Sequence, residues 1–237
     1  MKPEQLQPHD FWQEILPAGS LSLPEGFTDC YPAEFADGRQ LVLPIRQLPH
    51  SHHAVASLIV NQASFAVLGT LADAVAERLK PFAPDIVVGV PTLGLTLAGA
   101  VAPRLGHARY VPLGTSKKFW YLDELSVPLS SITTPGHQKR LHIDPRMLPL
   151  IEGARVALVD DVISSGTSML AGLRLLAAVD VEPVVLGVAM VQTDRWQHRI
   201  AEFGAGLPER VVGALHTPLL ARGANGLWQP ETAHHPF

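Results

Sequence analysis

One segment constrains the fold of this chain more than any other: residues 156–168, VALVDDVISSGTS. Its four leading apolar residues predict a buried strand, and two adjacent carboxylates, Asp160 and Asp161, follow that strand directly. A short turn of Ser, Gly and Thr then leads into an apolar helical pattern. In an open α/β sheet the ligand crevice lies at the carboxyl ends of the strands, and a small glycine-containing turn there lets backbone N–H groups approach an anion. The segment therefore predicts a phosphate site at the end of a buried strand.

Apolar strands alternate with helical patterns on both sides of this segment. Helices are expected at 65–79, 93–105 and 166–178, and strands at 85–90, 109–113, 155–159, 183–191 and 210–215. This alternation predicts an α/β fold, with a mostly parallel central sheet flanked by helices and joined by right-handed crossovers. Residues 127–133 and 139–144 flank a Thr-Thr-Pro-Gly turn, which predicts a β-hairpin arm.

The two ends of the chain carry weaker patterns. Prolines punctuate the first fifty residues, where only 40–48 reads as a strand, and Pro44 within it predicts an edge position. From Thr217 onward apolar residues are sparse, so this stretch is expected to lie over the core as an extension. We therefore predict a small N-terminal hood or extension (1–55), an α/β core (56–216) and a C-terminal extension (217–237).

Composition excludes several classes of protein. Of 237 residues, 47% are hydrophobic and 17% charged, which predicts a packed core rather than disorder. A net charge of -4 argues against a general nucleic-acid binder. The single cysteine, Cys30, excludes an intramolecular disulfide framework and a multi-cysteine metal site. The uncharged run 86–103 is interrupted by Pro91 and by glycines, so a strand, turn and buried helix explain it better than a membrane span, and a cytoplasmic setting is expected.

The segment 156–168 resembles the fingerprint of the type I phosphoribosyltransferases, in which four hydrophobic residues, two acids, two hydrophobic residues and a small Ser/Thr/Gly loop bind phosphoribosyl pyrophosphate (PRPP). The resemblance implies that Asp160 and Asp161 engage the ribose 2′ and 3′ hydroxyls and help, indirectly and with the substrate, to hold Mg²⁺. It also implies that the 5′-phosphate is wrapped by Ser164, Ser165, Gly166, Thr167 and Ser168. The alternative is a capped helix after a strand that happens to end in Asp-Asp.

The same family has a second loop, after the first core strand, that contacts pyrophosphate. Here it corresponds to VPTLG, the five residues Val90, Pro91, Thr92, Leu93 and Gly94. Backbone amides at a helix start favour an anion, and the resemblance implies a non-proline cis peptide within this loop. The alternative is an ordinary turn that only connects a strand to a helix.

A third implied feature is a mobile loop that closes over the substrate and delivers a lysine to the pyrophosphate. Lys117 and Lys118, within 114–125, are the candidates, and the alternative is an ordinary solvated pair. Lys139 and Arg140 are further cations that a dimer could bring to the pyrophosphate. Phe27 and Gln192 are base-binding candidates, chosen by position alone.

The histidines His50, His52 and His53 cluster at a spacing that can bind a metal, yet no cysteine or helical spacing supports a built site, so a polar loop is the favoured interpretation.

The resemblance implies an enzyme, a Mg²⁺-dependent phosphoribosyltransferase that moves the 5-phosphoribosyl group from PRPP to a nucleobase or related nitrogen heterocycle and releases pyrophosphate. A homodimer with no nucleic-acid or membrane partner is expected. Ser164 stands where the 6-oxopurine enzymes usually carry a carboxylate, which disfavours hypoxanthine or guanine as the acceptor. The alternatives are a non-catalytic PRPP-sensing regulator on the same fold and an unrelated α/β protein with a chance motif.

Overall fold

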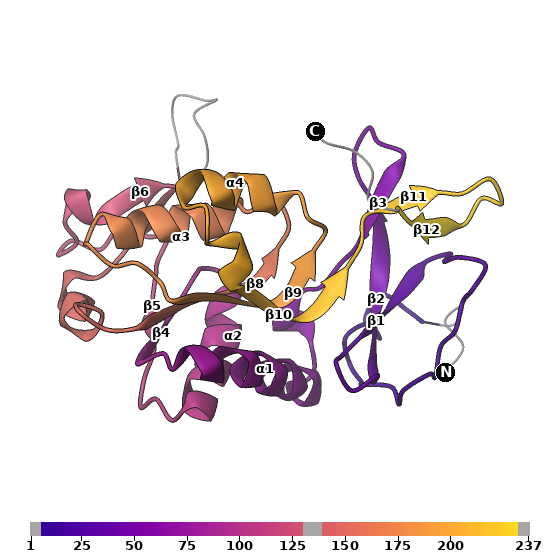
Figure 1. Ribbon diagram of the computed structural model, residues 1–237, viewed down its shortest axis with the longest axis horizontal. Coiled ribbons are helices and arrows are strands. Elements are labelled where there is room, and N and C mark those ends of the chain that lie inside the picture. The colour runs from indigo at the N-terminus through magenta and orange to yellow at the C-terminus, as the bar shows by residue number, and fades with distance from the viewer. Residues whose placement is uncertain (1–5, 130–138, 232–237) are drawn as a thin grey trace.

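A computed structural model describes residues 6–129 and 139–231 of the chain. These residues form a parallel sheet covered by helices, an antiparallel sheet beside it, and a small two-stranded hairpin (Figure 1). The predicted α/β fold with a parallel central sheet is confirmed. We call the parallel sheet and its helices the core, and the antiparallel sheet the hood.

The core sheet has five parallel strands in the order β10-β9-β8-β4-β5. They are β4 (Ile86–Gly89), β5 (Val111–Pro112), β8 (Val156–Ile163), β9 (Val185–Gln192) and β10 (Val211–Thr217). From β4 the chain moves to one edge of the sheet through β5, whereas from β8 it moves to the other edge through β9 and β10. The strand order therefore reverses between β4 and β8, and the loops that follow these two strands diverge over a crevice of the kind that binds ligands in open α/β sheets.

Helices cover both faces of the core sheet (Figure 1). One face packs against α1 (Phe65–Leu79) and α2 (Gly94–Val101), and the other against α3 (Thr167–Ala177) and α4 (Trp196–Phe203). Short 3-10 turns occur at Val60–Gln62, Lys80–Phe82, Ala102–Leu105, Asp123–Leu125, Pro145–Leu150 and Pro208–Arg210. The helix expected to reach Leu105 stops at Val101 and tightens into a 3-10 turn, because Pro103 cannot donate to the helical ladder.

Strand β8 is longer than its sequence pattern predicts. It was expected to end at Val159, but it continues through both aspartates to Ile163, because β9 still pairs with it there: Val162 lies opposite Met190 and Ile163 opposite Val191. Pairing with β4 ends at Val159. Asp160 and Asp161 therefore stand on a rigid strand whose other neighbour has already turned away.

The hood is a five-stranded antiparallel sheet in the order β1-β2-β3-β11-β12. Its strands are β1 (Cys30–Glu34), β2 (Gln40–Gln47), β3 (His53–Ala56), β11 (Leu220–Arg222) and β12 (Trp228–Pro230). The C-terminal stretch, expected to extend over the core, instead pairs with β3 and completes this sheet. Strands β11 and β12 have three residues each, too few to show an alternating pattern, so the sequence did not predict them.

The expected edge position of Pro44 is wrong, since β2 lies between β1 and β3. The two neighbours are staggered along β2: β1 pairs with Gln40–Pro44, and β3 pairs with Ile45–Gln47. Pro44 lies where the pairing with β1 ends and the pairing with β3 begins, and its carbonyl accepts a hydrogen bond from the N–H of Ser57 at 2.9 Å. A missing N–H costs little at such a junction, so a proline is tolerated inside the sheet.

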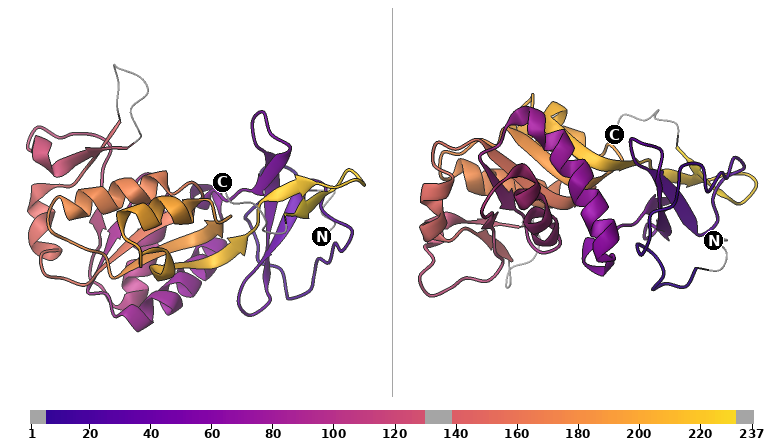
Figure 2. Two further views of the ribbon diagram at one scale, coloured as in Figure 1. Left: turned by 45° about the horizontal axis from the view of Figure 1, so that its top comes forward. Right: turned by 90° about the horizontal axis from the view of Figure 1, so that it is seen from below.

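The predicted hairpin arm is confirmed by antiparallel strands β6 (Ser126–Pro128) and β7 (Arg140–His142), and its Thr-Thr-Pro-Gly turn lies outside the described residues. The hairpin and the hood lie at opposite ends of the molecule (Figure 2). Within 6–129 and 139–231, no helix has the length and apolar character needed to cross a membrane. The run 86–103 is a strand, a turn and a helix, as predicted.

Candidate functional site

Two of the predicted loops and the two predicted acids meet at the switch point. The pyrophosphate loop (Val90–Gly94) follows β4, and the phosphate loop (Ser164–Ser168) follows β8. A Cβ atom added at Gly94 would lie 2.6 Å from Oδ1 and 2.8 Å from Cα of Asp160, closer than side chains pack. The absence of a side chain at Gly94 therefore lets the pyrophosphate loop sit directly against the acid pair.

The phosphate loop presents a run of free backbone donors. Among the described residues, the N–H groups from Ser164 through Met169 find no hydrogen-bond acceptor. Gly166 has a φ of +75°, a left-handed conformation that favours glycine, and it begins α3. Residues 162–169 line a cavity of about 150 Å³. Free amides at a helix start attract an anion, so this cavity suits a phosphate group.

The pyrophosphate loop has a similar supply of donors. No acceptor within the described ranges takes the N–H groups from Thr92 through Leu95, whereas that of Val90 is bound to the carbonyl of Val159 at 2.9 Å. The peptide bond between Pro91 and Thr92 is cis, within the loop where the resemblance implies such a bond. Two sets of free amides therefore converge on one crevice from neighbouring strands.

The acid pair lies between these two loops. Asp160 is buried, with 4% of its surface exposed, and Asp161 is half-buried. The N–H of Asp161 donates to Oδ1 of Asp160 at 2.9 Å. Burial, together with the charge of Asp161, raises the pKa of Asp160 well above its usual range, and burial also raises the pKa of Asp161. Neither carboxylate has an ion-pair partner in the described part of the chain, so both can accept hydrogen bonds from ligand hydroxyls.

The protein side chains at this site could hold a metal ion only together with oxygen atoms of a bound ligand. Within the described residues no group of three or more His, Cys, Asp or Glu side chains could hold an ion. Two adjacent carboxylates fit Mg²⁺, which usually binds through few protein carboxylates and completes its shell with substrate oxygens and water. His53 hydrogen-bonds Ser51 at 3.0 Å and Glu231 at 3.3 Å instead of joining a metal cluster.

The lysine loop, residues 114–125, leaves β5 and is anchored on the hairpin. Gly114 and His142 exchange two backbone hydrogen bonds, of 2.9 and 2.8 Å. The ammonium of Lys117 pairs with Asp123 at 2.5 Å and holds the pKa of that carboxyl below its usual value, while Lys118 is exposed. Neither ammonium contacts the acid pair or the two anion loops within the described ranges.

The two base-binding candidates have structural contacts. Gln192 is buried, and its Nε2 donates to the carbonyl of Ala56 at 2.5 Å, which ties the end of β9 to the hood. Phe27 packs edge-on against Tyr31, with ring centroids 4.9 Å apart, and its backbone pairs with Trp228. Neither residue is in hydrogen-bond contact with the acid pair in the described structure.

Sequence reasoning missed two arginines beside the phosphate loop. Arg199 in α4 donates through Nη1 to the carbonyl of Ser165 at 2.9 Å and to Oγ1 of Thr167. Nη2 of Arg195 lies 3.5 Å from Oγ of Ser164. The sequence could have indicated these arginines, because they are four residues apart and so share one face of the helix. That helix follows β9, the strand next to β8.

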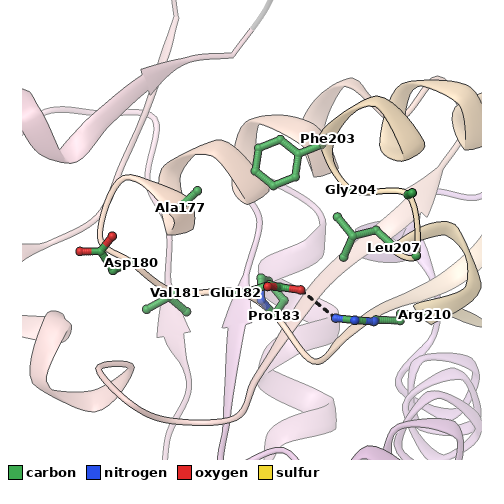
Figure 3. Close-up of a pocket in the computed structure, with 11 residues that line it drawn as sticks. Ala177, Asp180, Val181, Glu182, Pro183, Phe203, Gly204, Leu207 and Arg210 are labelled. Atoms are coloured by element: carbon green, nitrogen blue, oxygen red, sulfur yellow. Dashed lines mark hydrogen bonds and ion pairs between the residues drawn. The ribbon is translucent and has the colours of Figure 1, made fainter.

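A larger cavity, of about 470 Å³, lies away from these groups (Figure 3). Its lining comes from the ends of α3 and α4 and the turns before β9 and β10, so it opens at the amino ends of the strands. Two of its charged residues, Glu182 and Arg210, pair with each other at 2.9 Å (Figure 3). The convergent donors and acids lie at the opposite edge of the sheet, which marks that edge as the candidate site.

Part of this chain is similar to known proteins. A family model described as the phosphoribosyl transferase domain matches residues 55–203. Xanthine phosphoribosyltransferase of Chloroflexus aurantiacus is 35% identical over 40% of this chain and 44% of its own length. Adenine phosphoribosyltransferase of Helicobacter acinonychis is 30% identical over 47% of this chain and 60% of its own length. The chain thus spans about half the length of these curated relatives.

Solved structures show the same fold. The adenine phosphoribosyltransferase of Giardia lamblia complexed with 9-deazaadenine superposes with a TM-score of 0.55 at 20% identity, over 73% of this chain and 93% of that one. That of Rhodothermus marinus gives a TM-score of 0.52 at 23% identity, over the same shares. The family model covers more than half of the 237 residues, and it includes both anion loops and the acid pair. The chain belongs to the phosphoribosyl transferase domain family.

Proposed function

We propose that this protein transfers the 5-phosphoribosyl group of PRPP to a nucleobase or a related nitrogen heterocycle, with release of pyrophosphate. One observation carries the proposal: two loops of free amides meet at the switch point over two adjacent carboxylates, Asp160 buried and Asp161 half-buried, that have no cationic partner among the described residues. PRPP has phosphate groups at both ends and two hydroxyls between them, and the site offers donors, acceptors and donors in the same order. The names of the relatives, which include xanthine and adenine phosphoribosyltransferases, support it.

In this proposal each group of the site has a separate task. The phosphate loop binds the 5′-phosphate, and Asp160 and Asp161 accept hydrogen bonds from the ribose hydroxyls. Those hydrogen bonds offset the burial of the carboxylates and hold C1 of the sugar in a fixed place. The amides of the pyrophosphate loop face the leaving group, whose negative charge grows as its bond to C1 breaks. Donors already aligned with that charge stabilise the transition state without reorganising.

We assign Mg²⁺ to the same site, held by the acid pair together with substrate oxygens. When bound, the ion supplies positive charge that stabilises the departing pyrophosphate. With no third protein ligand in the described chain, its affinity is expected to depend on PRPP.

The lysine loop is proposed to close over bound PRPP and bring a cation to the pyrophosphate. Lys118 is exposed, whereas Lys117 would first have to leave Asp123, so we assign the contact to Lys118. Closure excludes water, which would otherwise hydrolyse the activated sugar. A homodimer and a cytoplasmic location stay predictions of the same proposal.

The acceptor is expected to be a base that needs no protein carboxylate at position 164. Ser164 stands there, and its hydroxyl lies beside the guanidinium of Arg195 rather than an acid. The acceptor is therefore proposed from outside the hypoxanthine and guanine class.

The test is pyrophosphate release from PRPP and Mg²⁺ over a panel of purine and pyrimidine bases, with a control lacking base. Release that depends on one base supports the enzyme and names its acceptor. Tight PRPP binding without release from any base would instead favour the PRPP-sensing regulator. Absence of PRPP binding would defeat the site assignment.

A further inference from the structure

Arg199 joins the two sides of the phosphate loop. Its Nη1 donates to the carbonyl of Ser165, at 2.9 Å, and to the hydroxyl of Thr167. These two acceptors stand on either side of Gly166, the residue with a φ of +75°. A single guanidinium nitrogen therefore fixes the left-handed turn from both directions.

The helix that carries Arg199 is itself docked on this turn. Trp196 is buried, with 4% of its surface exposed, and its indole donates to the carbonyl of Thr193 at 2.9 Å. A Cβ added at Gly166 would lie 3.3 Å from Cβ of Trp196, so the turn and the helix are in close contact. The helix that carries Arg199 and the turn that its side chain contacts are therefore packed against each other.

Arg195 lies one helical turn before Arg199, on the same face, with Nη2 3.5 Å from Oγ of Ser164. In the described ranges neither guanidinium has a carboxylate within ion-pair distance. The rim of the phosphate cavity therefore carries two positive charges that no carboxylate of residues 6–129 and 139–231 neutralises by an ion pair.

We infer that Arg199 is a positioning residue that holds the phosphate loop in its anion-binding form, and that Arg195 adds charge at its rim. This inference rests on the proposed function. Arg199 engages the Ser165 carbonyl, an acceptor that would repel a phosphate if it turned inward. The free amides from Ser164 to Met169 then stay available to the ligand. The loop is set before the ligand arrives, which lowers the ordering cost of binding.

The decisive measurement separates PRPP binding from turnover. Arg199→Ala is expected to raise KM for PRPP about 10- to 100-fold, the range for losing a hydrogen bond to a charged group. The 5′-phosphate is remote from C1, so kcat is expected to fall much less. Arg199→Lys keeps the charge but cannot reproduce the planar geometry, and it should give an intermediate KM. Arg195→Ala should raise KM by a smaller factor.

Inorganic phosphate, measured by calorimetry, probes the loop without the sugar. Its affinity should fall in Arg199→Ala but stay unchanged in Asp161→Asn, which should weaken PRPP binding only. Arg174→Ala is the matched control, an exposed arginine on α3 outside the site, and it should change neither constant.

Unchanged KM for PRPP and unchanged phosphate affinity in Arg199→Ala would overturn the inference and leave the proposed function intact. A lower Tm in Arg199→Ala with both constants unchanged would show a purely structural contact and would also overturn it. If the wild-type protein bound neither PRPP nor phosphate, the proposed function itself would fail, and the inference with it.

Discussion

The close approach of Gly94 to Asp160 makes Gly94→Ala the sharpest test of the site geometry. The added Cβ would lie 2.6 Å from Oδ1 and 2.8 Å from Cα of Asp160, whereas ordinary contact begins at 3.4 Å. The pyrophosphate loop or β8 must therefore shift by about 0.6–0.8 Å. One of the two atoms belongs to the backbone, so a side-chain rotation alone cannot relieve the overlap.

Two magnitudes follow from this shift. Overpacking of this kind costs about 1–3 kcal/mol of folding free energy, which lowers Tm by roughly 2–4 °C per kcal/mol in a chain of this size. Misplacement of a catalytic group by about 1 Å can cost about 10²-fold in rate. We expect kcat/KM for pyrophosphate release to fall about 10- to 100-fold, and PRPP affinity to fall with it.

Gly99→Ala is the matched control for this variant, since Gly99 lies in the same helix, α2. A Cβ there would lie 3.5 Å from the ring of Tyr110, an ordinary contact, and the residue is exposed. Alanine favours a helix interior over glycine by about 1 kcal/mol, so Tm should rise while turnover stays unchanged. If Gly94→Ala folded normally and kept wild-type PRPP affinity and turnover, the two loops would not form one site.

Three further predictions test the acids, the lysines and the contact between core and hood. Asp160→Asn should abolish PRPP binding yet raise Tm at neutral pH, because the raised pKa of Asp160 means that stability is lost as pH rises from the unfolded value, about 4, through the folded value. A thermal scan from pH 4 to 8 checks this, and a pH-dependence equal to that of wild type would contradict it. Lys118→Ala should slow pyrophosphate release with little change in Tm, and Lys117→Ala should slow it less; the reverse order would reassign the contact. Gln192→Leu should leave the carbonyl of Ala56 unpaired and lower stability by about 1–3 kcal/mol, whereas an unchanged Tm with a higher KM for the acceptor would restore a base-binding role.

The local parts of the site could be predicted from the sequence. A buried strand, two acids, a small turn and a helix start all lie within 156–168, so no distant contact is needed to recognise them. The burial of Asp160 could not be predicted in this way. It depends on the pairing of β9 with β8 beyond Val159 and on the close approach of Gly94, which lies in the loop after β4. The positions of Arg195 and Arg199 have the same cause, because only the parallel register of β8 and β9 brings α4 to the phosphate loop.

The part of the hood contributed by the C-terminal strands could not be predicted, because this sheet is assembled from distant segments. Strand β3 ends at Ala56 and its neighbour β11 begins at Leu220, and β11 and β12 have three residues each. Strands of that length show no usable alternation. The predicted edge position of Pro44 was wrong for a related reason. Pro44 is tolerated inside the sheet because β1 and β3 pair with different parts of β2, and the sequence of one strand does not show where its neighbours begin and end.

The pairing of β3 with β11 also sets an order of folding. About 160 residues separate the two strands, so all five core strands leave the ribosome before β11 can close the hood. Until then β3 is an open edge whose unpaired backbone groups can recruit another chain. The interval between synthesis of β3 and synthesis of β11 is thus a period in which a newly made chain exposes an unpaired strand edge that favours aggregation.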